Sequence, residues 1–378
     1  MTDTGRAIHA TFGQYRIETM RLRAIRGERP GAGLRVRKAF GAGRAVIRAS
    51  LALAIASLLL TSLFAFFGSA FPAAAKAESI GSSDAAGFPA SPVEAPLRLI
   101  SLNPSLTAIL VRLGATEMLV GVDDYSARVL PEVSNLPRVG GLFDPSLEAV
   151  VALRPDRVLI VAGVEQVTHA ERLERLGLRV DIYPNERMDE ILENIERLGR
   201  LVGRESLASE RVSMIRETRR AVFVATRGRE APGTVAIVDR SPLFLVGGET
   251  FLDEMLDVVG ARNLVRELGA GYPRGSIEWL IATGPSLLLD MTPGAEAAKE
   301  FWSRWPSLPA VAADRVVGVD AARITMPGPN LDRALRELAL LVHGASIEDA
   351  IDEALKRGRA ESVLTDRDHE RAGPGGAQ

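Results

Sequence analysis

The 378-residue chain contains no cysteine, only 5% aromatic residues and four histidines. The absence of cysteine excludes disulfide bonds, thiolate metal sites, a cysteine nucleophile and a lipid anchor attached through cysteine. Three signatures of catalysis are also missing: the G-x-x-x-x-G-K-[ST] phosphate loop, the H-E-x-x-H zinc helix and the G-x-S-x-G nucleophile elbow. No set of acid, base and nucleophile stands out, so we expect neither enzymatic activity nor a bound cofactor.

Positive charge is scarce outside the first part of the chain. Residues 1–48 carry 11 Lys/Arg against 3 Asp/Glu, and Lys76 adds one more cation. Because the whole chain has a net charge of −2, the part from Glu78 onward carries −11. Phosphate contacts require a basic face, so this acidic body argues against nucleic-acid binding. The hydrophobic content of 47% is ordinary for a protein with a packed core.

One long uncharged run, residues 49–71, follows a basic stretch and precedes a run of small residues. This order is typical of a secretory signal peptide, so we assign residues 1–77 as a signal region that is cleaved after Ala75 or Ala77. The protein is then periplasmic. The same run is long enough to span a bilayer as an uncleaved anchor in the inner membrane, and that alternative stays open. The basic stretch is unusually long, which is consistent with a true start near Met20.

Residues 78–96 are rich in Ser, Pro, Ala and Gly and indicate a flexible linker. Beyond it, predicted strands and helices alternate, which indicates parallel sheets covered on both faces. The predicted strands are 97–102, 119–122, 234–239 and 315–320; the predicted helices are 105–115, 248–261 and 328–344; helix–strand pairs span 144–163 and 276–290. In the first pair, Asp144 is expected to cap the helix, with Pro145 at its first position.

Residues 205–228 lack strand signals and predict one helix of about 20 residues, roughly 30 Å long. We therefore divide the chain into an N-terminal lobe, a connecting helix, a C-terminal lobe and a tail. Their ranges are 97–203, 204–230, 231–345 and 346–378. The end of the tail is charged and Gly-rich, and we expect the tail to be partly disordered.

An internal repeat supports two similar lobes. The segment SLEAVVALRPDRVLIV (146–161) aligns with SIEWLIATGPSLLLDM (276–291), which pairs Ser146 with Ser276 and Glu148 with Glu278. A helix ending in Gly-Ala precedes each segment. Repeated lobes usually place a ligand at their interface.

Other segments make a family resemblance specific: RLISLNPSLTAILVRLGA, GVDDYS, FLDEMLDVVGARNL and PGPNLDRALRELALLVH. Together with the repeat, they show that residues 97–345 resemble the periplasmic substrate-binding proteins of ABC importers for cobalamin, haem and ferric siderophores. The cobalamin-binding subgroup is the most similar. The resemblance implies two Rossmann-like α/β lobes with parallel sheets joined by a single long α-helix. It also implies a monomer that captures a metal chelate and delivers it to a permease dimer with its ATPase.

The resemblance implies a docking site on each lobe. Glu148 and Glu278 match the glutamates that dock onto arginines of the permease in the family. Two carboxylates held apart on a rigid frame can fix the register of a dimeric partner. The simpler alternative is that each glutamate is a solvated residue in the first turn of a helix, where the helix dipole favours a carboxylate.

The resemblance also implies a ligand-binding cleft. Tyr125 and Tyr272 match aromatic cleft positions of the cobalamin binders, and flat macrocycles bind against aromatic faces. Other cleft positions that are aromatic in relatives are small or aliphatic here, and Phe143 and Phe244 are candidates to compensate. Arg323 is a candidate to meet a carboxylate or phosphate of the ligand. The alternative for each is an ordinary surface or packing residue.

Three further features remain. His169 is a candidate axial ligand for haem iron or corrin cobalt, or else a surface residue at a helix start. Trp302 and Trp305 are expected to pack their helix onto the second lobe, with a place at the rim of the cleft as the alternative. Asp123 and Asp124 form an acidic pair without companion ligands, so we expect no metal site. Haem or a ferric siderophore is an alternative cargo, and a membrane-tethered sensor ectodomain or a cofactor-assembly protein is an alternative function.

Overall fold

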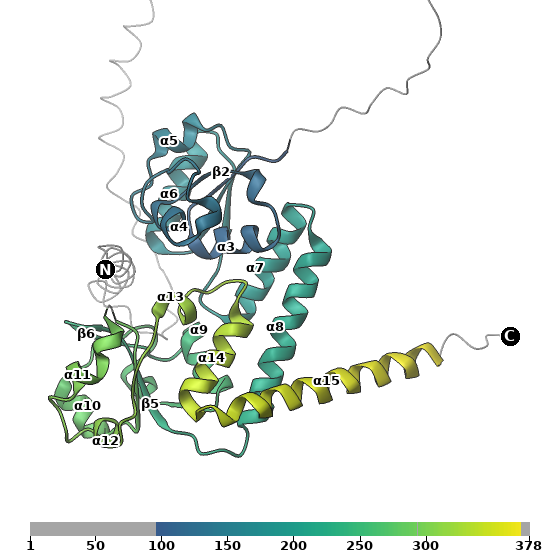
Figure 1. Ribbon diagram of the computed structural model, residues 1–378. Coiled ribbons are helices and arrows are strands. Elements are labelled where there is room, and N and C mark those ends of the chain that lie inside the picture. The colour runs from purple at the N-terminus through teal and green to yellow at the C-terminus, as the bar shows by residue number, and fades with distance from the viewer. Residues whose placement is uncertain (1–95, 293, 372–378) are drawn as a thin grey trace, which may run out of the picture. The chain divides into compact units, whose positions relative to one another are not determined.

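The computed structural model describes residues 96–292 and 294–371. The signal region and almost all of the linker that we predict from the sequence lie outside these residues. Among the described helices, none combines the length and the apolar character that a membrane crossing needs. Figure 1 shows the described part as two α/β lobes with helices between them.

The first lobe is built on a four-stranded, fully parallel sheet in the order β2-β1-β3-β4. The strands are β1 (Leu99–Ser101), β2 (Leu119–Val122), β3 (Arg157–Val161) and β4 (Val180–Tyr183). The helices are α3 (Pro104–Arg112), α4 (Asp124–Val129), α5 (Leu147–Ala152), α6 (Val164–Arg175) and α7 (Met188–Leu201), with 3-10 turns η1 (Thr116–Met118) and η2 (Pro131–Val133). The short apolar strands are buried on both faces, as the sequence predicts.

The second lobe contains a five-stranded sheet in which β6-β5-β8-β9 form the main path and β7 also pairs with β5. The strands are β5 (Gly233–Arg240), β6 (Leu243–Leu245), β7 (Arg262–Asn263), β8 (Leu287–Asp290) and β9 (Val316–Gly318). The helices are α9 (Phe251–Val258), α10 (Ile277–Thr283), α11 (Ala298–Trp302), α12 (Pro309–Ala312), α13 (Ala321–Ile324) and α14 (Leu331–His343), with 3-10 turns η3 (Leu264–Leu268) and η4 (Ala295–Ala297).

This second sheet corrects one expectation, because it is mixed and not parallel throughout. Strand β6 runs antiparallel to β5. The two strands are joined by the tight turn at Ser241-Pro242, and a turn this short can connect only antiparallel neighbours. The other pairings in the sheet are parallel.

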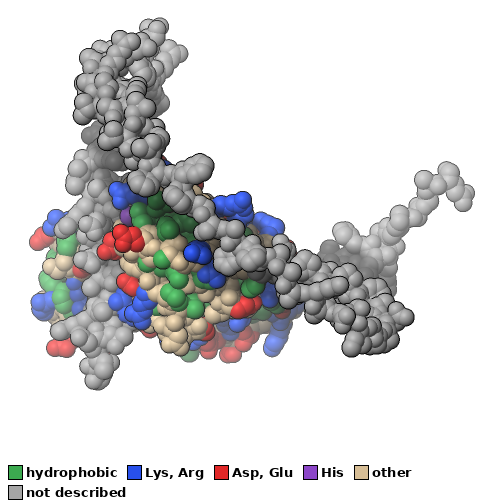
Figure 2. Space-filling view, turned by 90° about the horizontal axis from the view of Figure 1, so that it is seen from above, with side chains coloured by type: hydrophobic (Ala, Val, Ile, Leu, Met, Phe, Trp, Pro, Cys, Tyr) green, Lys and Arg blue, Asp and Glu red, His purple; other side chains and the backbone are tan. Residues whose placement is uncertain are grey.

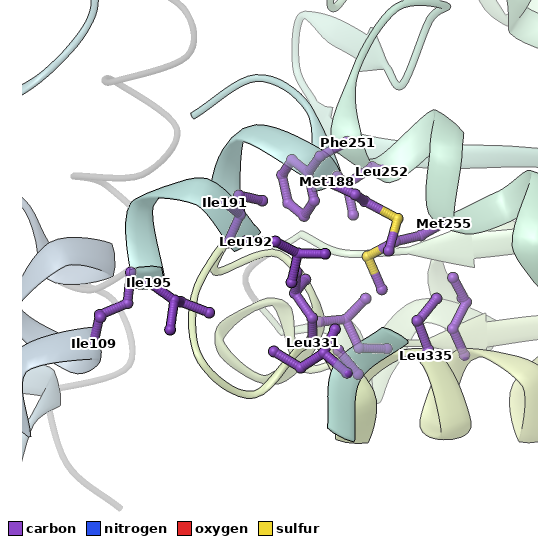
Figure 3. Packing of buried hydrophobic residues seen from close by; sticks show 14 of the residues in the cluster. Ile109, Met188, Ile191, Leu192, Ile195, Phe251, Leu252, Met255, Leu331 and Leu335 are labelled. Carbon is purple, nitrogen blue, oxygen red and sulfur yellow. The ribbon is translucent and has the colours of Figure 1, made fainter. Parts of the chain in front are cut away.

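A shared apolar core joins the inner faces of the two sheets. Figure 3 shows its centre, where Met188 and Ile191 of α7 lie close to Phe251 and Met255 of α9, with Leu331 of α14 nearby. The outer face of each sheet has a separate cluster. Val150 of α5 belongs to the outer cluster of the first lobe, and Leu280 of α10 belongs to that of the second lobe. Thus α5 and α10 occupy equivalent outer positions.

Polar contacts reinforce the shared core between the lobes. The side chain of Glu254 in α9 accepts a hydrogen bond from the Met188 amide at 2.8 Å and pairs with Arg187 at 2.7 Å. Met188 is the first residue of α7, whose own N-cap residue is an arginine without an acceptor for the helix amides. A glutamate of the second lobe therefore caps a helix of the first lobe.

The long helix predicted between the lobes is α8 (Glu205–Thr226), 22 residues in length. Its buried Arg211 donates a hydrogen bond to the Pro329 carbonyl at 2.5 Å and forms an ion pair with Asp332 of α14. Helix α8 is thus attached to the second lobe along its side as well as through the chain.

Within the tail, residues 346–371 form the helix α15 (Ser346–Arg371), and residues 372–378 lie outside the described part of the chain. Ile347 and Ile351 are buried in the shared core, and Ala354 and Leu355 pack against it. These residues recur at helical spacing, so one side of a highly charged segment is apolar. The high charge of the tail obscured that pattern.

Candidate functional site

Two short helices carry the candidate docking residues. Helix α5 begins after Ser146, whose hydroxyl accepts a hydrogen bond from the Ala149 amide at 3.2 Å. Helix α10 begins after Ser276 in the same way, with the Trp279 amide at 3.1 Å. The same local signal, a serine cap, therefore starts both repeated helices.

The first of these helices begins later than the sequence predicts. Asp144 and Pro145 were expected at its cap and first position, but the cap is Ser146. Pro145 instead forms a β-bridge with Gly140, which holds the chain extended up to the serine. This start makes the two repeats alike.

Glu148 and Glu278 lie in the first turns of α5 and α10, and both are exposed. Hydrogen bonds from its own amide and from the Ser276 hydroxyl lower the pKa of Glu278, so it is ionised at neutral pH. One carboxylate therefore projects from the outer side of each lobe.

Tyr125 lies near the start of α4 and is 1% exposed. Burial raises the pKa of its hydroxyl to about 12, and the carboxylate of Asp320 contributes to the increase. Asp320 follows β9 of the second lobe, so the ends of β2 and β9 approach each other. Arg128 lies 5.4 Å from the Tyr125 ring centroid and opposes the rise in pKa. Asp123, in the same lobe as the tyrosine, also raises this pKa, so the tyrosine lies between the lobes beside one cation and two anions.

His169 and Phe143 lie together in the first lobe. The Nε2 atom of His169 is 2.8 Å from the Phe143 carbonyl oxygen, which can only accept, so Nε2 carries the proton. The buried Nδ1 atom has no hydrogen-bond partner in residues 96–292 and 294–371. Of the two ring nitrogens, Nδ1 is the one with a free lone pair.

The remaining cleft candidates lie in the second lobe. Phe244 is buried on β6 and forms a β-bridge with Arg274. Tyr272 is half-buried and packs against the shared core. Arg323 is exposed, and its guanidinium lies 3.2 Å from Glu337 of α14. The structure therefore brings Tyr125 near one carboxylate of the opposite lobe, that of Asp320, and provides Arg323 with a protein carboxylate.

Sequence reasoning gave no role to three aspartates at the carboxyl ends of strands. Asp123 follows β2, Asp290 ends β8, and Asp320 comes two residues after β9. Asp123 and Asp290 are completely buried. Ligands of open α/β sheets bind outside the carboxyl ends of the strands. The position of each aspartate at the end of a predicted strand was the available signal.

Other expectations concern packing and metals. Trp302 is buried and lies 5.4 Å from Trp305, ring centroid to centroid, in the outer cluster of the second lobe. Both tryptophans therefore pack their segment onto the lobe, as predicted. Within the described ranges, no group of three His, Cys, Asp or Glu side chains is placed to hold a metal ion.

Comparisons with known proteins agree with this architecture. Residues 99–322 match the model of a family described as periplasmic binding protein. An uncharacterised ABC transporter substrate-binding lipoprotein of Bacillus subtilis is 27% identical over 258 residues, covering 65% of this chain and 79% of that protein. A vitamin B12-binding protein of Vibrio parahaemolyticus is 26% identical over 248 residues, covering 65% and 88%.

Solved structures show the same fold. The periplasmic vitamin B12-binding protein of Vibrio cholerae has a TM-score of 0.59 at 22% identity, covering 67% of this chain and 97% of that one. A periplasmic heme-binding protein of Roseiflexus has a TM-score of 0.58 at 22% identity, covering 68% and 100%. Relatives of the same fold thus bear names of two different chelates.

Proposed function

Because this chain belongs to the periplasmic binding protein family, we propose that it is the solute-binding component of an ABC importer, without enzymatic activity of its own. The family match over more than half of the chain carries this proposal. The signal region would deliver the protein to the periplasm, or the uncleaved run 49–71 would tether it to the inner membrane. In either case it binds its solute outside the cytoplasm.

We place the solute between the carboxyl ends of the two sheets, where Tyr125 approaches Asp320. Phe143, Phe244 and Tyr272 remain proposed lining residues. Tyr125 is buried, so a ligand would reach its ring only after the ends of β2 and β9 separate. The shared core joins α7, α9 and α14 and also includes Val122 and Val319 at these strand ends, so it would keep the movement small.

The charges at this point favour a neutral chelate, and we propose a corrinoid such as cobalamin. Two carboxylates, Asp123 and Asp320, act on Tyr125 together with the single cation of Arg128, so this point has no excess of positive charge for an anionic ligand. Arg323 already has the carboxylate of Glu337 as its partner. A corrinoid presents mostly neutral amides around its ring, whereas haem carries two carboxylates and many siderophores are anionic. An anionic ligand would have to compete with Glu337 for Arg323.

Delivery would use the two outer carboxylates. We propose that Glu148 and Glu278 each dock onto a basic group of one permease subunit. They lie on equivalent helices of the two repeats, which matches a partner with two equivalent subunits. Rim charges of this kind mainly influence association rate, register and salt dependence.

A ligand titration tests the proposed function. The purified protein is titrated with cyanocobalamin, haemin and several ferric siderophores, and binding is followed by visible absorbance and tryptophan fluorescence. We expect saturable 1:1 binding of the corrinoid with a Kd of about 1 μM or tighter. Tyr125→Ala should weaken it, while Phe301→Ala, which removes an aromatic ring from the outer cluster of the second lobe, is the control. Haemin binding would correct the cargo, and failure of every chelate would contradict the function.

A further inference from the structure

The helices α5 and α10 share a second exposed feature. Val151 is 40% exposed and Ile281 is 38% exposed, and both stand five residues after the capping serine. Each follows a docking glutamate by three residues, and residues at this spacing are neighbours on a helix surface. Each carboxylate therefore lies beside an exposed β-branched apolar side chain.

Packing within the protein does not explain these side chains. Val150 and Leu280 are completely buried and attach their helices to the outer clusters, to which neither Val151 nor Ile281 belongs. A single exposed apolar residue is ordinary. The same position, three residues after the glutamate, is exposed and β-branched in both repeats, which is more informative than one exposed residue. Figure 2 views the first lobe from the side of α5 and shows uncovered apolar side chains among charged ones.

We propose that each half of the docking surface combines a carboxylate with an apolar contact, Glu148 with Val151 and Glu278 with Ile281. The occupant is the permease of the importer, whose two subunits would each present a cation next to an apolar side chain. This inference rests on the proposed docking role of the two glutamates. The apolar contact would exclude water from the ion pair and lengthen the lifetime of the complex.

The pairing of charge with apolar surface also distinguishes the permease from a second copy of this chain. In a two-fold symmetric dimer of this chain, each docking surface would contact the same surface of the other copy, so Glu148 would face carboxylates. Like charges brought together in this way oppose association. A partner that carries cations has the complementary charge, and two equivalent faces require a partner with two equivalent sites.

Binding to the permease tests the inference with two double variants. Val151→Thr with Ile281→Thr keeps the branched shape but makes the contact polar. Glu148→Gln with Glu278→Gln keeps the size but removes the charges. The permease with its ATPase is placed in lipid nanodiscs, and binding of the full chain is followed over a range of salt concentrations. Leu207→Thr, at an exposed apolar position of α8, is the matched control.

We expect the threonine pair to raise the Kd on the order of tenfold, mainly through faster dissociation, with an unchanged salt dependence. The glutamine pair should flatten the salt dependence. Native-like binding by the threonine pair, together with weakened binding by the glutamine pair, would overturn this inference alone. Native-like binding by both pairs would overturn the proposed docking function itself. Unchanged thermal melting and chelate affinity in each variant exclude a folding defect.

Discussion

Each lobe buries an aspartate at the carboxyl end of a strand, but the two are stabilised differently. In the first lobe, Asp123 accepts hydrogen bonds from the amides of Tyr125 and Ser126 at 2.9 Å and from the Ser126 hydroxyl. Burial raises its pKa to about 6 despite these bonds. Neutral donors therefore compensate only in part for removing this carboxylate from water.

In the second lobe, Asp290 has a cation as well as neutral donors. Arg240 Nε lies 2.9 Å from one carboxylate oxygen, and Trp302 Nε1 donates to the same oxygen at 2.6 Å. The amide and hydroxyl of Thr292 donate to the other oxygen. This network joins β5, β8 and α11, so it stabilises the packing of the second lobe. Asp123 instead caps the helix that carries Tyr125.

The largest effect should come from removing the cation of the second lobe. Arg240→Met leaves Asp290 buried without its charge partner, and breaking such a pair costs about 3–5 kcal/mol. We expect a decrease of this size in the free energy of unfolding, measured by urea denaturation.

Arg304→Met is a matched control, because Arg304 lies 4.2 Å from the Phe301 ring centroid and Arg240 lies 4.3 Å from the same centroid. Arg304 is exposed and has no role toward Asp290, so its loss should change the unfolding free energy little. If both variants lose the same amount of unfolding free energy, the contact with the Phe301 ring, and not the buried ion pair with Asp290, accounts for the loss in Arg240→Met.

In the first lobe, Asp123→Asn should reveal a stability difference that depends on pH. The folded-state pKa of about 6 lies above the usual value of 3.8. As pH rises between these values, the unfolded carboxyl ionises first, and the native protein loses stability. Above pH 6 this penalty is complete, at about 3 kcal/mol for a shift of two units. Asparagine has no such penalty.

Urea unfolding at pH 4 and pH 8 measures this difference. Asp123→Asn should gain stability relative to the native protein on going from pH 4 to pH 8, while Asp124→Asn controls for loss of a neighbouring carboxylate. A stability difference that stays constant with pH would show that Asp123 is not the titrating group. The burial of Asp123 would then not reduce stability at neutral pH, although Asp123 lacks the cationic partner that Asp290 has.

The parts of this molecule that follow from local sequence signals could be predicted. Buried apolar runs identified the parallel strands, and the absence of strand signals between residues 205 and 228 identified α8. The repeat placed Glu148 and Glu278 on equivalent helices because a serine cap is a local feature. The antiparallel β6, only three residues long, has too short an apolar run to reveal its partner.

The cleft could not be predicted in the same way, because its properties depend on partners distant in the chain. Tyr125 is buried beside Asp320, which is almost 200 residues further on. The sequence around Arg323 contains no sign of a partner, yet its guanidinium forms an ion pair with Glu337 of another helix. The packing of the lobes and helices decides which side chains become neighbours. A local sequence pattern contains no information about such distant contacts.

The smallest effect concerns how the two docking helices end. After α10, Gly284 adopts a left-handed conformation with φ of 61°. The equivalent residue after α5 is Arg154, with φ of 46°, where a residue other than glycine is strained. Arg98 donates hydrogen bonds to the carbonyls of Leu153 and Arg154, which helps to hold this turn.

Exchanging these residues should therefore shift stability in opposite directions. Arg154→Gly removes the strain but adds freedom to the unfolded chain, and we expect a net gain of about 1 kcal/mol in unfolding free energy. Gly284→Arg should lose a similar amount, because arginine is strained in the left-handed conformation. The loss should be no larger, because a Cβ there would meet only the Pro309 ring, at an ordinary 3.6 Å. Thermal unfolding of both variants measures the difference. A loss of stability in Arg154→Gly would mean that the arginine side chain contributes more to the first lobe than its backbone costs.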